Sequence, residues 1–523
     1  MKIPTRRLVG WLLLCLALAA CQKTATVSGP AGRNGPNVLR FDVAAPFISL
    51  DPAEGDASGA TMIFPLLYSY LAVPDENGRL QPDLAESWTY DAGDLTWTIR
   101  LRDNAFFHDG RPVTAEDLCF SFQSVLKNIQ PILMESIESL QIISDHVLAV
   151  QLKRHDPAFI RKIWALEVLP CRDPDTGGRY PPIGSGPFAF ASQEGEQKIV
   201  LIANENYYKG RPAIDGVIFY YQPDQEKTWT RLLSGTTDIA REISPKNFEI
   251  TRQYQDRFYF YHYTLEYYSI LLYNTADPLF ADPAVRRALT LAIDRRYIVD
   301  YILNGYGREA IGPMGLDSPF SDPGLAPLAY DPETALAGLR AAGWTRDGRG
   351  RLLDKDGRPF AFTLLISDET QVEKNVARYI QLCFNDIGIR MAVRSRPYKE
   401  IVARYYNNND FQAILTEFPG AGRQPEYAIK GWIPDDQGQT LAGNFSDPQV
   451  TDLIERGLRA ADRRTAALYF RQAEARLIAL QPGSFLYHKT ALDVMSRRFS
   501  LSAPFSLTCE GLFRLGQAAP ARP

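Results

Sequence analysis

The sequence predicts an α/β protein with two lobes, and three features carry this prediction. The chain has 523 residues, well beyond the roughly 250 to 300 residues at which a single hydrophobic core stops growing. Strand, turn and helix signals follow one another from Leu80 to Leu118. A strand, a helix and a second strand at 360–393 are typical of a parallel strand pair. We therefore expect two or more lobes that each combine a sheet with helices.

Residues 1–20 have the pattern of a signal peptide. Basic residues precede an apolar run from Leu8 to Ala20, and the letters LAAC at 18–21 resemble the end of a lipoprotein signal, where Cys21 is lipidated. Such a run makes a helix of about 20 Å, too short for a hydrocarbon core of roughly 30 Å. We predict cleavage and lipid attachment at Cys21. The alternative is a secretory peptide cleaved elsewhere, with Cys21 incidental.

Residues 21–37 are predicted to form a flexible tether, because they are rich in Gly, Pro, Ser and Thr and lack an apolar period. Without residues 1–20 the chain holds 54 basic and 61 acidic residues, a formal charge of −7. No block of Lys and Arg stands out, whereas a nucleic acid surface needs clustered cations. We therefore expect no nucleic acid partner.

The first lobe is predicted to open with a strand at 38–43, followed by a loop and a helix in LLYSYL. Tyr68 and Tyr70 stand two positions apart there, so on a helix at most one of them belongs to the core. Further along, the letters PIGSGPF at 182–188 place two glycines around a small residue, a composition typical of a tight crossing. Later elements of this lobe are a strand at 217–221, a helix at 227–233 and an extended segment ending at Asn274.

The clearest local signals lie in the segment Leu80–Leu118. Apolar residues at 95, 97, 99 and 101 alternate with polar ones, which is the period of a half-buried strand. Thr114 stands three residues before Asp117, as in a capping box. The helix that it starts would bury one face, formed by Leu118, Phe122, Val125 and Leu126.

The second lobe is predicted to begin near residue 276, and its sequence contains several signals for the first turn of a helix. Asp-Pro pairs at 282, 331 and 447 each supply a capping side chain and a first-turn proline. The strand–helix–strand succession and a strand at 411–418 lie between them, and a further helix surrounds Arg464. We interpret FLYH at 485–488 as the return of the chain to the first lobe, so that two crossings form a hinge.

Four cysteines stand in the body of the chain, and none forms a CxxC pair. In an oxidising compartment they could form disulfides in three pairings, or remain as buried thiols. The sequence leaves both possibilities open for Cys119, Cys171, Cys383 and Cys509.

The sequence lacks the common catalytic motifs. The chain has no GxSxG, no P-loop, no HExxH and no cysteine set with metal spacing. Its five histidines are scattered, and His108 is best interpreted as a hydrogen-bonded loop residue. We therefore predict a protein that is not an enzyme, with no catalytic residues, no cofactor and no metal site.

Several longer stretches resemble one known family. PDLAESW at 82–88, LRDNAFFHDGRPVTAEDL at 101–118, PIGSGPF, NENYYKGRP at 204–212 and the segment 272–299 are similar to the substrate-binding proteins of bacterial peptide and nickel ABC importers, the extracellular solute-binding protein family 5. The resemblance implies a periplasmic-binding-protein-like fold of the large peptide-binding type, with an extra subdomain inserted in the first lobe. The predicted parts are lobe I core at 38–52, 183–275 and 486–516, an inserted subdomain at 53–182, and lobe II at 276–485.

The resemblance also suggests where a ligand binds. The loop before the first long helix faces the ligand in this family, which here selects Asp56 and Ser58. Peptide-binding relatives often place an aspartate after a tryptophan in a second segment, at 415–432, to pair with the α-ammonium of the peptide. This chain has PGAGR at 419–423 instead, which departs from the pattern of a dipeptide-binding relative.

Within this second segment the chain offers its own candidates. Glu417 or Glu426 could replace the missing acid, and Arg423 could pair bidentately with a ligand carboxylate. Tyr427 is a further candidate, and Trp432 could either wall the pocket or belong to the core.

We therefore predict a monomeric, lipid-anchored and exported receptor that captures a peptide or peptide-like solute between two lobes and delivers it to an ABC permease. Within the same class, the alternative ligands are a nickel chelate, haem, a saccharide or a modified peptide. From other classes, the alternatives are an interaction lipoprotein without transport and a peptide hydrolase, although the latter lacks a nucleophile and base set.

Overall fold

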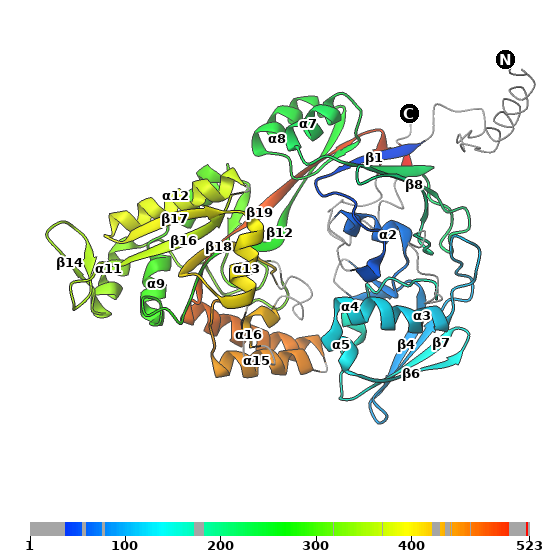
Figure 1. The fold of residues 1–523 in the computed structure, drawn as a ribbon, viewed down its shortest axis with the longest axis horizontal. Helices are drawn as coiled ribbons and strands as arrows, with labels where there is room; N and C mark the ends of the chain where they lie inside the picture. Colours follow the sequence, from blue (N-terminus) through cyan, green and yellow to red (C-terminus); the bar gives the residue numbers. More distant parts are fainter. Residues whose placement is uncertain are drawn as a thin grey trace, which may run out of the picture.

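The computed structural model describes residues 37–54, 59–75, 79–171, 182–316, 318–368, 370–420, 429–434, 440, 442–460, 462–500 and 519–520. Two lobes lie side by side, and the long strands β12 and β19 run between them (Figure 1). Each lobe has its own hydrophobic core. The fold is therefore α/β and two-lobed, as the sequence predicts.

One sheet extends through both lobes. Among the described residues it has eleven strands, and its edge-to-edge order is β17-β16-β18-β12-β19-β11-β1-β10-β9-β8, with β13 pairing to β19. Their bounds are β17 (Arg390–Arg396), β16 (Ala361–Ser367), β18 (Ala413–Phe418), β12 (Phe258–Tyr273), β19 (Gly483–Ser496), β11 (Ile239–Ala240), β1 (Val38–Val43), β10 (Gly216–Tyr221), β9 (Lys198–Ala203), β8 (Phe188–Glu194) and β13 (Gly307–Glu309).

Lobe I carries a separate sheet of four strands, ordered β4-β5-β7-β6. The alternation predicted at 95–101 becomes strand β5 from Thr96 onward, and Trp97, Ile99 and Leu101 are buried. Leu95 precedes the strand with a φ of 54°, so the prediction was wrong for this residue. The capping box of Thr114 and Asp117 is present and starts α3. Bounds in this part are β2 (Ala72–Pro74), β3 (Leu80–Pro82), β4 (Ala85–Asp91), β5 (Thr96–Leu101), β6 (Ile137–Ser144), β7 (Val147–Leu152), η1 (Pro52–Glu54), η2 (Ala60–Met62), α2 (Phe64–Leu67), α3 (Ala115–Ser121), η3 (Phe122–Leu126), α4 (Lys127–Ile129), α5 (Pro131–Glu135), α6 (Ile160–Ile163), α7 (Gln225–Leu233), α8 (Pro245–Thr251) and η5 (Arg252–Tyr254).

The PIGSGPF segment passes directly over helix α2. A Cβ atom on Gly184 would lie 1.9 Å from the carbonyl oxygen of Leu67, so no other residue fits without moving backbone. His108 ties this segment down, because its Nδ1 accepts from the Gly184 amide at 3.2 Å and its Nε2 donates to the Gly186 oxygen at 3.1 Å. The tight crossing and the structural interpretation of His108 are confirmed.

The expectation for Tyr68 and Tyr70 is wrong. Both side chains are buried. The reason is that α2 ends at Leu67 and Tyr68 is already extended, so the spacing of helix faces does not apply to this pair.

Helices in lobe II begin where the Asp-Pro pairs predict. The carboxylates of Asp282, Asp331 and Asp447 each accept a backbone hydrogen bond in the first turn of their helix. Strands β16 and β17 are parallel, as the sequence favours. The remaining bounds are α9 (Pro283–Leu291), α10 (Arg295–Tyr297), η6 (Ile298–Ile302), α11 (Pro332–Ala341), β14 (Thr345–Arg346), β15 (Leu352–Leu353), α12 (Gln371–Asp386), α13 (Tyr398–Asn408), η7 (Ile429–Trp432), α15 (Pro448–Arg459), α16 (Arg463–Leu480), β20 (Phe499–Ser500) and β21 (Ala519–Pro520).

Two further features concern the described part of the chain alone. Cys119 and Cys383 are free thiols there, Cys171 is exposed, and Cys509 lies outside it. Among the same residues, no helix is both long and apolar enough to span a bilayer.

Candidate functional site

Two paired strands carry the chain between the lobes. β12 and β19 run antiparallel from Phe258 opposite Ser496 to Leu272 opposite Gly483. At one end β19 also pairs with β11 of lobe I, and at the other end β12 also pairs with β18 of lobe II. The register shifts between Thr264 and Tyr268, where three β12 residues face the single residue Lys489. Such a bulge bends a strand locally.

The lobe I half of this crossing pair has one covered and one half-open face. On the covered face, Phe258, Phe260, Leu492 and Val494 pack against α7 and α8. In Figure 1, α7 and α8 lie above the crossing strands. The face turned away from these helices carries a row of half-buried rings, Tyr259, Tyr261 and Tyr263, which we name the tyrosine row. Tyr259 and Tyr261 pack against the core of lobe I, and the guanidinium of Arg497 lies over the Tyr259 ring.

A buried acid lies beside the tyrosine row. Asp493 of β19 is fully buried, and its carboxylate accepts from the Tyr263 hydroxyl at 3.0 Å and from the Glu242 amide at 2.9 Å. Burial raises the pKa of Asp493 to about 6, although the nearby charge of Arg241 acts in the opposite direction. Asp493 is therefore a hydrogen-bond acceptor that holds Tyr263 and the backbone after β11 in place.

Arg241 follows β11 directly and lies near Asp493. Its side chain is 18% exposed, and one terminal nitrogen is 3.4 Å from Oε1 of Glu242. The other terminal nitrogen contacts Sδ of Met62 at 3.5 Å. The Nε atom is buried and has no hydrogen-bond partner among the described residues. A side-chain hydrogen bond also joins Arg241 to Tyr263, so Glu242, Met62 and Tyr263 hold the guanidinium at the edge of the tyrosine row.

The lobe II half of the crossing holds an ion pair. Lys489 of β19 pairs with Glu417 of β18 across β12. Burial lowers the pKa of Lys489, but Glu417, Tyr487 and Glu373 together outweigh this effect and leave the pKa raised. On the bulge, the carbonyl oxygen of Glu266 accepts from the Gly420 amide at 2.9 Å. The bulge is therefore fixed to the end of β18, directly before the segment 421–428.

Two of the ligand-binding residues predicted from the sequence lie in the described part of the chain. Glu417 lies in the crossing region, but Lys489 already compensates its charge. Trp432 is 1% exposed and lies in the core of lobe II among Phe418, Phe445 and Phe485. Outside the described residues lie Cys21, Asp56, Ser58, Arg423, Glu426 and Tyr427.

Sequence reasoning missed the tyrosine row, Asp493 and Arg241. The sequence does contain a signal for the tyrosine row. In a strand, the alternation of FYFYHY at 258–263 places Tyr259, Tyr261 and Tyr263 on one face. A lone acid inside the apolar run ALDVM at 491–495 signals a buried, hydrogen-bonded carboxylate. Nothing local marks Arg241, because its setting depends on Met62 and Asp493 from distant parts of the chain.

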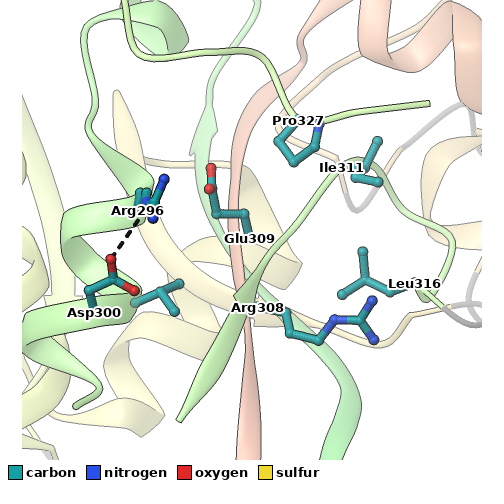
Figure 2. Close-up of a pocket in the computed structure, with 8 residues that line it drawn as sticks. Arg296, Asp300, Arg308, Glu309, Ile311, Leu316 and Pro327 are labelled. Atoms are coloured by element: carbon teal, nitrogen blue, oxygen red, sulfur yellow. Dashed lines mark hydrogen bonds and ion pairs between the residues drawn. The ribbon is translucent and has the colours of Figure 1, made fainter. Parts of the chain in front are cut away.

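A different hollow lies wholly within lobe II. It has a volume of about 390 Å³. Figure 2 shows Arg296 of α10 and Asp300 of η6 facing Arg308 and Glu309 of β13 across it. Arg296 and Asp300 form an ion pair of 3.4 Å, so these charges compensate each other. Because its lining comes from one lobe, closure of two lobes would not enclose a ligand there. The described residues contain no cluster of three or more His, Cys, Asp or Glu suited to a metal ion.

Comparison with known proteins identifies relatives along the whole body of the chain. Residues 79–439 match the profile of the family described as "Bacterial extracellular solute-binding proteins, family 5 Middle". Oligopeptide-binding protein AppA of Bacillus subtilis (strain 168) is 26% identical over 506 residues, which cover 91% of this chain and 92% of the relative. The nickel-binding periplasmic protein of Escherichia coli (strain K12) is 29% identical over 355 residues, covering 65% of this chain and 67% of the relative.

Solved structures agree in fold. The structure of AppA from Bacillus subtilis in complex with a nonapeptide matches with a TM-score of 0.77 at 24% identity, over 93% of this chain and 100% of that one. At this identity the match concerns the fold alone, which is consistent with the two-lobed architecture.

Proposed function

The chain belongs to family 5 of the bacterial extracellular solute-binding proteins, and from this premise we propose that it captures a peptide or peptide-like solute between its lobes and delivers it to an ABC permease. Members of this family are binding proteins and not enzymes. One relative is named for oligopeptides and another for nickel, so family membership alone does not select the ligand.

The observation that carries the proposal is the double crossing with its tyrosine row. Aromatic rings give a ligand a large apolar contact area, and a few placed polar groups orient it. Arg241 and the ion pair of Lys489 with Glu417 supply such groups from the two lobes. A ligand that contacts both lobes binds better to the closed arrangement and shifts the population toward it. The predicted residues Asp56, Ser58, Arg423 and Tyr427, and the predicted domain boundaries, remain part of this proposal.

Capture by closure has a measurable result. We expect that adding a peptide extract to the purified mature protein reduces the radius of gyration in small-angle X-ray scattering. Native mass spectrometry should show the bound solute as an added mass, and the peptides should be recovered intact. Scattering profiles that superpose with and without the extract, or peptides that return cleaved, would contradict the proposal.

The same mass spectrum decides between a peptide and the other ligand classes. Lys489 compensates Glu417, and the chain lacks the aspartate found in peptide-binding relatives, so a solute without a free α-ammonium is the second candidate. A modified peptide satisfies this condition, and a nickel chelate, haem or a saccharide would be recognised by its mass.

We further propose that the mature protein is anchored to a membrane through a lipid on Cys21. We expect that Cys21→Ser moves the protein from the membrane fraction to the soluble fraction, because several buried acyl chains supply the membrane affinity and each CH₂ contributes about 0.8 kcal/mol. Cell fractionation with immunoblotting measures this shift, and Cys15→Ser is the matched control inside the predicted signal. A C21S protein that stays in the membrane fraction would contradict the anchor.

A further inference from the structure

Tyr306 of lobe II contacts a helix of lobe I. Its ring lies at 76° to the ring of Phe248 in α8, with 5.8 Å between the two centroids. Its hydroxyl donates to Oε1 of Glu249 in the same helix. The carbonyl oxygen of Tyr306 also accepts from the amide of Thr490 in β19 at 3.2 Å. One side chain beside the crossing strands thus connects the two lobes.

The loop that carries Tyr306 is held by lobe II. It connects η6 to β13, and two successive positive φ angles, 52° at Asn304 and 77° at Gly305, form its turn. The Gly305 amide donates to the carbonyl oxygen of Val299 at 2.9 Å, and the Tyr306 amide donates to that of Leu303 at 2.9 Å. The side chains of Val299 and Leu303 are buried in a core of lobe II. Tyr306 therefore moves with lobe II.

Helix α8 is held by lobe I. Phe248 belongs to the buried cluster that α7, α8 and β11 form with the crossing strands. Nε1 of Trp229 in α7 donates to the hydroxyl of Thr251 in α8 at 2.8 Å, which ties the two helices together. β11 in turn pairs with β1 in the sheet of lobe I. The contact of Tyr306 with α8 therefore joins parts of the protein that belong to different lobes.

This contact lies on the face of the crossing strands that α7 and α8 cover (Figure 1). The tyrosine row lies on the opposite face. Gly307, the residue after Tyr306, pairs with Lys489 of β19, which also faces the bulge of β12. Turning of the lobes at this bulge in the direction that brings them together beside the tyrosine row would separate them beside α8, because the crossing strands lie between the two faces.

We propose that Tyr306 is a latch that opposes closure of the lobes. For the lobes to close on a solute, the Tyr306 ring has to leave Phe248 and the hydroxyl has to leave Glu249. This inference rests on the proposed function, capture by closure, and adds a residue that sets the affinity for the captured solute. Part of the binding free energy is used to break the contact, so the apparent affinity is lower than in a protein whose lobes close freely.

The test uses Tyr306→Phe in the mature protein, because this change removes the hydroxyl and keeps the ring. The measurement is the dose of a tryptic casein digest that gives half of the maximal decrease in radius of gyration in small-angle X-ray scattering. We expect Y306F to need about 3- to 10-fold less digest than wild type. This factor corresponds to a hydrogen bond of modest net strength, as expected for a half-exposed carboxylate.

Tyr301→Phe is the matched control, because it removes the same hydroxyl from an exposed tyrosine of η6. Y301F should respond to the digest at the wild-type dose. Glu249→Ala removes the acceptor and should lower the dose as Y306F does. Combining it with Y306F should bring little further change, since both substitutions break the same hydrogen bond.

The outcomes separate the latch from the proposed function. If folded Y306F needs as much digest as wild type, or more, the latch is overturned, while the response of wild-type protein leaves the proposed function in place. If the scattering of wild-type protein does not respond to the digest at any dose, the proposed function fails and the latch fails with it.

Discussion

Trp432→Ala is expected to lower the free energy of unfolding by about 3 to 5 kcal/mol, the usual cost of removing a buried tryptophan side chain. The indole is 1% exposed, and the ring centroids of Phe418 and Phe485 lie 5.6 and 5.7 Å from it. Alanine would leave a cavity in the middle of this aromatic group. Urea unfolding followed by far-ultraviolet circular dichroism measures the loss without depending on tryptophan fluorescence.

Trp432→Phe provides the graded control, since it keeps an aromatic ring in contact with its neighbours and should cost much less than alanine. Trp88→Ala, at a half-buried position of strand β4, tests whether any tryptophan has this effect. If W432A unfolded at the same urea concentration as wild type, Trp432 would not belong to the core of lobe II.

Local sequence signals predicted much of the fold, because the interactions behind them are local. The Asp-Pro helix starts need only a side chain and the backbone two or three residues later, and the structure has them at Asp282, Asp331 and Asp447. The same is true of Thr114 and Asp117. The prediction for Tyr68 and Tyr70 was wrong because it assumed that both residues lie on a helix, whereas α2 ends at Leu67.

The candidate site could be predicted only in part, because its residues meet through pairing across long sequence separations. Asp493 meets Tyr263 and Glu242 only after β19 has paired with β12 and β11. In the same way, Glu417 could be selected as an acid from the sequence, but its pairing with Lys489 follows from the three-strand order β18-β12-β19. The family resemblance gave the architecture, whereas the chemistry of the crossing strands came from tertiary contacts.

Unfolding stability is expected to depend on pH through Glu474 of α16. This side chain is fully buried, and it accepts from the Ser321 hydroxyl at 2.9 Å and the Met314 amide at 3.3 Å. Burial raises the pKa of Glu474 from 4.5 to about 7. A raised pKa of an acid means that the folded protein favours the protonated form. The contribution is therefore fully present below pH 4.5 and is lost as the pH rises through 7.

The expected size of this loss is about 3 kcal/mol, because each pKa unit corresponds to about 1.4 kcal/mol. Glu474→Gln cannot ionise, so its stability relative to wild type should increase by about 3 kcal/mol between pH 4.5 and pH 8. Urea unfolding at both pH values measures this difference, and comparison with wild type removes the parallel effect of Asp493, whose pKa is also raised. Glu455→Gln on α15 is the control, since that carboxylate is exposed and pairs with Arg459, and its difference from wild type should hardly change with pH. If the difference in unfolding free energy between E474Q and wild type stayed the same at both pH values, Glu474 would ionise in the folded protein at little cost. Water would then reach the carboxylate past the segment that contains Met314 and Ser321.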